Sequence, residues 1–121
     1  MEERTKKYLA DILAAIEEIE SFFAGSPKLF ESFLNNLCLR RAVERNIEII
    51  GEAMNRILKT DPNIQITNSR KIVDARNYII HGYDSLSADI LWSIVINHLP
   101  KLKTEVENLL RWIFPSNFAC I

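Results

Sequence analysis

The residues best suited to chemistry gather in one stretch, from Arg76 to Tyr83, which reads Arg-Asn-Tyr-Ile-Ile-His-Gly-Tyr. Arginine is permanently charged and can grip phosphate oxygens through two N–H groups at once. Histidine passes protons near neutral pH, and His81 is one of only two histidines in the chain. In the absence of a carboxylate cluster for a metal, these residue types indicate metal-free cleavage of RNA, in which the 2′-hydroxyl attacks the adjacent phosphorus.

In that reaction His81 would move a proton, Arg76 would stabilise the charge on the phosphoryl oxygens, and Asn77 would orient either one. DNA lacks the attacking hydroxyl, so the chemistry is confined to RNA. Five residues of helix turn through about 500°, so the Arg76 and His81 side chains leave a regular helix roughly 140° apart. They converge if the helix loosens at His81-Gly82, or across the two-fold axis of a dimer.

Ordinary structural roles explain the same residues. A histidine before a C-terminal glycine can bond the last carbonyls of a helix. Asn77 alone is often a capping or interhelical hydrogen-bond residue, and Tyr83 alone is often a half-buried aromatic. The residue types by themselves leave both interpretations open for His81. We interpret His98, which precedes Leu99-Pro100, as structural.

Apolar residues recur at helical spacing along almost the whole chain, which contains only three glycines and four prolines. This pattern predicts an all-α bundle of four to five helices, formed as a single domain by residues 1–121. The predicted helices run to Ala24-Gly25, from about Pro27 or Phe30 to Lys59 with Ser26 as N-cap, from Asn68 or Ser69 to Ile80, and from a cap at 84–87 to Phe114 with a kink or break at Pro100.

The second predicted helix contains Gly51, which costs about 1 kcal/mol relative to alanine in a helix. A close crossing with another helix would justify this glycine better than a break in the helix would. The same helix carries a charged face, which we interpret as a solvated or interface surface tied by intrahelical ion pairs. The functional alternative is that Arg41 or Arg45 faces the active cleft. The acidic residues of this face are spaced four apart: Glu44, Glu48 and Glu52.

The overall charge limits how nucleic acid could bind. The formal net charge is -1 and the isoelectric point is about 6.1, so RNA needs a local positive patch or an oligomer that concentrates one. The first residues lack the apolar core of a signal peptide, and no apolar run reaches the roughly 20 residues of a membrane span. Cys38 and Cys120 fit neither a disulfide framework nor a metal cluster. We therefore expect a cytoplasmic protein with reduced thiols.

The stretch from Arg76 to Tyr83 resembles the Arg-x4-His-x-Tyr motif of HepT-like toxins in the HEPN superfamily. Two other stretches are similar to the same family. They are Arg45-Asn46-Ile47-Glu48-Ile49-Ile50-Gly51-Glu52-Ala53 and Ile90-Leu91-Trp92-Ser93-Ile94-Val95 leading to Leu99-Pro100. The resemblance covers nearly the whole chain.

The resemblance implies a metal-independent ribonuclease toxin of a type II toxin–antitoxin pair, without a cofactor. It implies a homodimer in which the motifs meet in a shared cleft. Residue by residue, Arg76 and His81 take the catalytic positions, and Asn77 takes the polar position beside the arginine. Tyr83 falls where such toxins receive AMP from a minimal nucleotidyltransferase antitoxin, MntA.

We expect RNA, with tRNA as one candidate, to meet a positive patch of Arg70, Lys71 and Arg76 that a dimer would double. The alternative function is a non-catalytic substrate-binding or scaffold subunit of a minimal nucleotidyltransferase. Both functions predict a dimer and a nucleotidyltransferase partner. They differ in whether Arg76 and His81 carry out chemistry.

Overall fold

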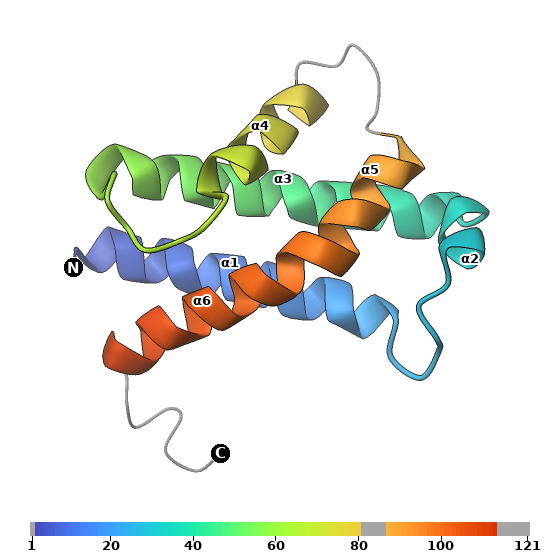
Figure 1. Cartoon of the computed structure of the whole chain (residues 1–121), viewed down its shortest axis with the longest axis horizontal. Coiled ribbons are helices and arrows are strands. Elements are labelled where there is room, and N and C mark those ends of the chain that lie inside the picture. Colours follow the sequence, from blue (N-terminus) through green and yellow to red (C-terminus); the bar gives the residue numbers. More distant parts are fainter. Residues whose placement is uncertain (1, 81–86, 114–121) are drawn as a thin grey trace.

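The computed structural model describes residues 2–80 and 87–113, and within these ranges it contains helices and their connections but no strand. The predicted all-α fold is confirmed. Figure 1 shows α5, a π-helical turn η1 and α6 following one another as one continuous helix. The elements in order are α1 (Glu3–Phe22), α2 (Phe30–Leu34), α3 (Leu37–Thr60), α4 (Ser69–Ile80), α5 (Ala88–Ser93), η1 (Ile94–His98) and α6 (Leu99–Ile113).

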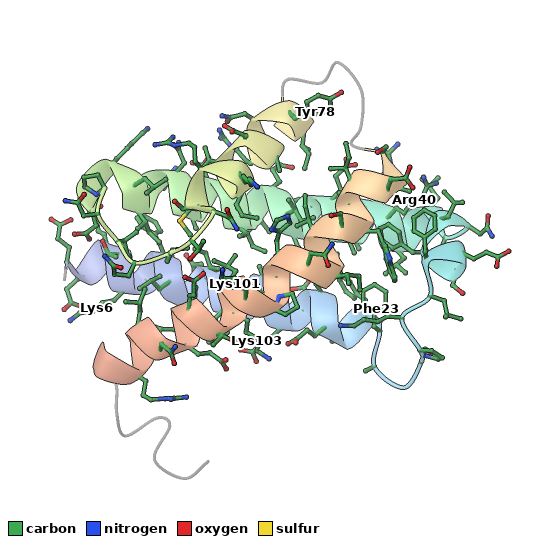
Figure 2. All side chains as sticks on the ribbon, in the orientation of Figure 1. Lys6, Phe23, Arg40, Tyr78, Lys101 and Lys103 are labelled. Carbon is green, nitrogen blue, oxygen red and sulfur yellow. The ribbon has the colours of Figure 1, made fainter. Side chains whose placement is uncertain are left out.

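The core lies where α1, α3 and the α5–α6 helix meet. α1 and α3 run side by side along the molecule, and α6 crosses over α1 (Figure 1). An ion pair joins α6 to α1, because the Lys103 Nζ donates to the Glu20 Oε1 over 2.8 Å; Figure 2 places Lys103 on the side of α6 that faces α1. The apolar faces predicted from helical spacing are buried, among them Leu9, Ile12, Ile16 and Ile19 of α1 and Val43, Ile47, Ile50, Met54 and Ile57 of α3.

α4 crosses α3 at Gly51, and the two backbones approach closely there. A methyl group on Gly51 would collide with the Cβ of Arg76 and would lie 2.9 Å from the carbonyl oxygen of Ile72. Only glycine leaves room for this approach. The predicted close crossing at Gly51 is therefore confirmed, and it sets Arg76 directly against α3.

The predicted long second helix is wrong in its first part, because the chain leaves the helical conformation between α2 and α3. Asn36 is extended (φ −114°, ψ 94°), and its side-chain oxygen accepts a hydrogen bond from the Leu39 N–H over 3.0 Å. Asparagine competes for backbone groups in this way, and a new helix starts after it. Ser26 and Pro27 do not begin a helix either.

α2 begins at Phe30, the second of the two predicted starts, and has no side-chain cap at its N-terminus. Tertiary packing holds this short helix, since the Phe30 and Phe33 rings lie 5.9 and 5.2 Å from the Trp92 ring of α5, measured between ring centres. Aromatic pairs at these separations attract one another beyond their buried area. The position of α2 thus depends on a contact with a distant helix rather than on its own capping residues.

Of the predicted kink or break at Pro100, the break is wrong, because the helix continues past this residue. Proline has no N–H to donate to the helical ladder. The ladder widens just before it: the Leu99 N–H bonds to the Ile94 carbonyl, five residues back, in the π-helical turn η1. Within residues 2–80 and 87–113, no helix combines the length and the apolar character that crossing a membrane requires.

Candidate active site

Arg76 lies in the second half of α4, where the crossing at Gly51 presses it against α3. Its guanidinium forms an ion pair with the Glu52 Oε2 through Nη2, and it donates to the Asn77 Oδ1 through Nη1 over 2.9 Å. The third nitrogen, Nε, is buried and has no hydrogen-bond partner in the described part of the chain. The guanidinium is thus oriented by two neighbours, while some of its five N–H donors remain available for a further acceptor.

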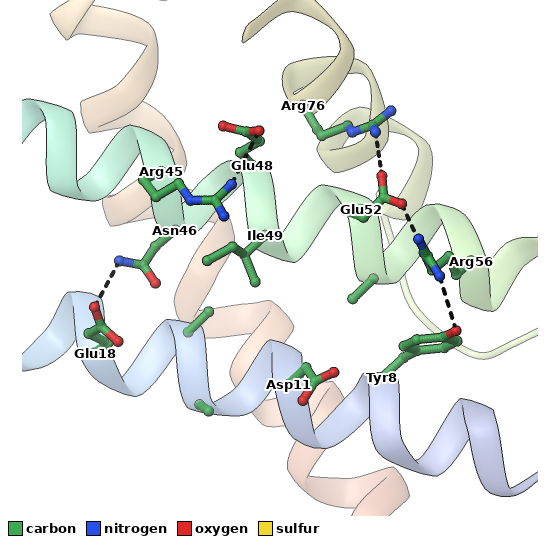
Figure 3. Close-up of a pocket in the computed structure, with 13 residues that line it drawn as sticks. Tyr8, Asp11, Glu18, Arg45, Asn46, Glu48, Ile49, Glu52, Arg56 and Arg76 are labelled. Atoms are coloured by element: carbon green, nitrogen blue, oxygen red, sulfur yellow. Dashed lines mark hydrogen bonds and ion pairs between the residues drawn. The ribbon is translucent and has the colours of Figure 1, made fainter. Parts of the chain in front are cut away.

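Glu52 lies between two arginines, as Figure 3 shows. Its Oε1 accepts from the Arg56 Nε over 2.8 Å, and its Oε2 contacts Arg76. The hydrogen bond from Arg56 lowers the pKa of the Glu52 carboxyl most, burial opposes this, and the charges of Arg76, Arg56 and Lys59 lower it further. The carboxylate stays ionised near neutral pH and connects α4 to α3.

The chain of contacts continues from α3 to α1. The Arg56 Nη1 donates to the Tyr8 Oη over 3.5 Å, and the Arg56 guanidinium lies 5.9 Å from the centre of the Tyr8 ring. These contacts and the Glu52 carboxylate raise the pKa of Arg56 above its ordinary value. Four side chains from three helices therefore form one connected row, Tyr8–Arg56–Glu52–Arg76 (Figure 3).

This row closes one end of a groove of about 550 Å³ between α1 and α3. Alanines and Ile49 form its apolar floor, and Arg76 reaches it from α4. At its other end Asn46 is almost fully buried, and its Nδ2 donates to the Ala42 carbonyl over 3.0 Å and to the Glu18 Oε1 over 3.4 Å. We call this space the α1–α3 groove.

The charged face of α3 contains the predicted ion pairs, and one of its arginines also reaches the α1–α3 groove. The intrahelical ion pairs are present: Arg41 lies 3.7 Å from Glu44, and Arg45 lies 3.2 Å from Glu48, measured from guanidinium nitrogen to carboxylate oxygen. Arg45 also lines the α1–α3 groove, whereas Arg41 does not. Pairing within a helix therefore does not prevent an arginine from facing the groove.

The predicted site residues fall into three groups. Arg76 and Asn77 are in direct contact, and their hydrogen bond agrees with an orienting role for Asn77. His81 and Tyr83 lie outside the described residues, so their positions remain predictions; α4 itself ends at Ile80.

The third group comprises the expected RNA contacts at the start of α4. Arg70 and Lys71 are both exposed, and neither lines the α1–α3 groove in the described part of the chain. Tyr78 lies between Arg76 and His81 in the sequence. It is 50% exposed and lies at the outer side of α4 (Figure 2). The side of α4 that carries Tyr78 therefore differs from the side that carries the Arg76 contacts.

Sequence reasoning missed the contact between Glu52 and Arg76. It assigned Glu52 to a charged face with intrahelical pairs, and the pair with Arg56 is indeed present. A signal for the second partner was available, because the crossing predicted at Gly51 brings a side chain of another helix next to residue 52. Tyr8 gave no such signal, since it reads simply as part of the apolar stripe of the first helix.

Comparisons with the sequences of known proteins identify the family of this chain. Residues 12–109 match the family model described as "Ribonuclease HepT-like". The Methanocaldococcus jannaschii protein named "Putative RNase MJ1380" is 36% identical over 104 residues, which span 84% of this chain and 93% of that protein. "Probable ribonuclease HepT" of Thermococcus cleftensis is 36% identical over 113 residues, spanning 90% of this chain and 98% of that protein. No solved structure gives a significant match. The chain belongs to the ribonuclease HepT-like family.

Proposed function

We propose that this protein is a metal-independent endoribonuclease, the toxin of a type II toxin–antitoxin pair. Family membership supports the ribonuclease activity. The observation that carries the proposal is the state of Arg76, whose guanidinium is held by Glu52 and Asn77 while its buried Nε has no partner in the described residues. An arginine fixed in this way is prepared to receive phosphoryl oxygens without further ordering.

The reaction needs one proton donor or acceptor and one fixed positive charge. The 2′-oxygen attacks the neighbouring phosphorus, the bond from phosphorus to the 5′-oxygen breaks, and a 2′,3′-cyclic phosphate and a 5′-hydroxyl result. Arg76 stabilises the negative charge that builds on the phosphoryl oxygens. His81 transfers a proton, either from the attacking 2′-hydroxyl or to the leaving 5′-oxygen. Asn77 and Glu52 orient Arg76.

A homodimer provides the geometry that one regular helix cannot provide. Side chains five positions apart leave a helix in different directions, so an arginine and a histidine related by a two-fold axis can share one cleft. In this proposal residues 1–121 form one domain per protomer. The exposed Arg70 and Lys71 of each α4 contribute positive charge for RNA.

Regulation of the nuclease would act beside Arg76. In the proposal, an MntA-like nucleotidyltransferase antitoxin transfers AMP to Tyr83, seven positions after Arg76 in the sequence. The added phosphate is a strong acceptor for guanidinium N–H groups and would compete with RNA phosphate for Arg76. AMP at this position would therefore silence the nuclease.

The test is cleavage of tRNA and total RNA by the unmodified protein in EDTA, after its intact mass has excluded AMP on Tyr83. We expect wild-type protein to leave 2′,3′-cyclic phosphate ends, and Arg76→Ala and His81→Ala to lose at least about 100-fold in rate. Arg41→Ala is the matched control, because it removes an exposed arginine of α3 that lies outside the groove. Intact RNA, or equal cleavage by all four proteins, would contradict the catalytic proposal and favour the binding-subunit alternative.

A further inference from the structure

A second hollow opens beyond the row of Tyr8, Arg56 and Glu52. It has a volume of about 310 Å³ and shares these three residues with the α1–α3 groove, so the two spaces adjoin. The remaining lining comes from the first turn of α1 and the last turn of α3, namely Arg4, Lys59 and Thr60. We call this space the Arg4–Lys59 hollow.

The hollow carries an excess of positive charge. Its lining contains the cations of Arg4, Arg56 and Lys59 and the single carboxylate of Glu52. Both oxygens of that carboxylate are already engaged, one by Arg56 and the other by Arg76. Arg4 and Lys59 are exposed, and neither forms an ion pair within residues 2–80 and 87–113. The chain as a whole has a formal net charge of -1, so the positive charge of the hollow is a local feature.

One cation of the hollow has fixed partners, and the helices that carry the other two are tied together beside it. Arg56 is fixed from two sides by the Glu52 Oε1 and the Tyr8 Oη. The ends of α1 and α3 are joined beside it, because the fully buried Thr5 donates from Oγ1 to the Asp61 Oδ2 over 2.8 Å. This bond ties the first turn of α1, which carries Arg4, to the residue that follows α3, which carries Lys59.

We propose that the Arg4–Lys59 hollow binds the sugar–phosphate backbone of the RNA strand on one side of the cut. Repeated negative charge along a flexible strand is the ligand chemistry that such a series of cations fits. The series leads to the catalytic position, because Arg56 of the hollow and Arg76 share one carboxylate. The inference rests on the proposed ribonuclease function and assigns its substrate a path along the ends of α1 and α3.

The experiment compares Arg4→Gln/Lys59→Gln with the control Lys28→Gln/Lys101→Gln, in protein that carries no AMP. Each double variant removes two exposed charges, but Lys28 and Lys101 lie outside both the hollow and the groove. The substrates are a single-stranded RNA of about 12 nucleotides and a dinucleotide, which contains the cut site but is too short to fill the hollow.

For the longer RNA we expect the Arg4/Lys59 variant to raise KM about 10-fold at moderate salt, with the effect on KM rather than kcat. The slope of log KM against log salt should become shallower by about 1.4, since each lost phosphate contact on a single strand contributes about 0.7. The control variant and the dinucleotide should show neither change. Binding of an RNA of the same length with 2′-O-methyl sugars should weaken in parallel.

Failure of this inference is distinguishable from failure of the proposed function. If the wild type cleaves RNA but the Arg4/Lys59 variant matches the Lys28/Lys101 control in KM and salt slope, the hollow is not the RNA path. Equal losses on the dinucleotide and the longer RNA would also overturn it, because the cations would then act at the cut itself. If no protein cleaves RNA, the ribonuclease proposal fails, and the binding of the methylated RNA still decides whether the hollow holds the strand.

Discussion

The two ends of the α1–α3 groove use similar pairs of residues, but a carboxylate accompanies the pair at one end and a second arginine accompanies it at the other. At each end an arginine of α3 pairs with a glutamate of the same helix: Arg45 with Glu48 over 3.2 Å, and Arg56 with Glu52 over 2.8 Å. At the first end Glu18 adds a second carboxylate, and Asn46 bonds to it. We call these the acidic end and the basic end of the groove.

The difference arises from the helix that crosses the basic end. α4 passes over α3 at Gly51 and brings Arg76 to the Glu52 carboxylate, while Lys59 and Arg4 lie just beyond. The comparison teaches that local helix contacts, rather than the overall composition, place positive charge on a mildly acidic protein.

The largest expected effect is on the rate of RNA cleavage. It should appear when a glutamate at the basic end is replaced by glutamine, but not when the same replacement is made at the acidic end. In Glu52→Gln the negative charge is lost and an NH2 group replaces one of the two carboxylate oxygens, so one of the two arginines faces a donor in place of an acceptor. We expect kcat for RNA to fall by up to about 100-fold, as misplacement of a catalytic group allows. KM should not rise, because a negative charge beside the hollow has been removed.

The matched control is Glu48→Gln, one helical turn earlier on α3, where Arg45 is the one ion-pair partner of the carboxylate among residues 2–80 and 87–113. Its kcat should stay within twofold of the wild type. Equal losses in the two variants, measured as kcat and KM in EDTA, would show that the two ends do not differ in function. A loss confined to KM in Glu52→Gln would contradict an orienting role for this residue.

The next prediction concerns the crossing that creates the basic end. In Gly51→Ala the added methyl collides with the Cβ of Arg76. Overpacking of this kind costs about 1–3 kcal/mol, and the better helix propensity of alanine offsets up to about 1 kcal/mol. We expect a lower free energy of unfolding in denaturant titrations and a reduced rate of RNA cleavage, since α4 must move away from Glu52.

Gly25→Ala is the control, because it destabilises the protein through backbone strain and not through a clash between helices. Gly25 has a φ of 79°, and a methyl group there would meet nothing within 4 Å. Alanine in this left-handed conformation costs about 1–2 kcal/mol, without any displacement of α4. Stability should therefore fall in both variants, whereas cleavage should fall only in Gly51→Ala. Undiminished cleavage by Gly51→Ala would show that the close crossing is not needed to position Arg76.

The sequence predicted the parts of the fold that depend on periodicity and on single residues. The buried stripes of α1 and α3 follow directly from apolar spacing. Gly51 predicted the crossing, because a glycine among good helix formers destabilises a helix unless close packing requires it. The break at Asn36 was missed because asparagine is tolerated inside a helix and also caps one. The packing of Phe30 and Phe33 against Trp92, which accompanies the break, joins segments far apart in the sequence and is not visible in a helical pattern.

The candidate site was predicted only where its residues are close together in the sequence. Arg76 and Asn77 stood out as neighbours of the right chemical type, and the structure places them in contact. The partner Glu52 and the cations Arg4 and Lys59 come from other helices, so their proximity depends on how those helices pack. Periodicity states which face of a helix is buried, but not which residues of two helices lie opposite one another.

A smaller effect is expected from pH, again at the basic end. Arg56, and then Arg76 and Lys59, hold the pKa of the Glu52 carboxyl below its ordinary value of 4.5. A depressed pKa stabilises the folded protein above the unfolded pKa, and this contribution is lost as the pH falls through the folded pKa. The difference in unfolding free energy between the wild type and Glu52→Gln should be constant above about pH 5 and should narrow at lower pH. A difference that widens on acidification would contradict the ion pairing of Glu52.

The smallest expected effect separates the two contacts that Tyr8 makes with Arg56. In Tyr8→Phe the hydroxyl acceptor at 3.5 Å disappears, but the ring below the guanidinium remains. We expect a change in unfolding free energy below about 0.5 kcal/mol, and a KM for RNA within twofold of the wild type. Tyr8→Leu keeps an apolar side chain but removes the aromatic face, which attracts cations. If KM rises only in Tyr8→Leu, the ring orients Arg56 at the edge of the hollow; if KM rises equally in both variants, the hydroxyl does.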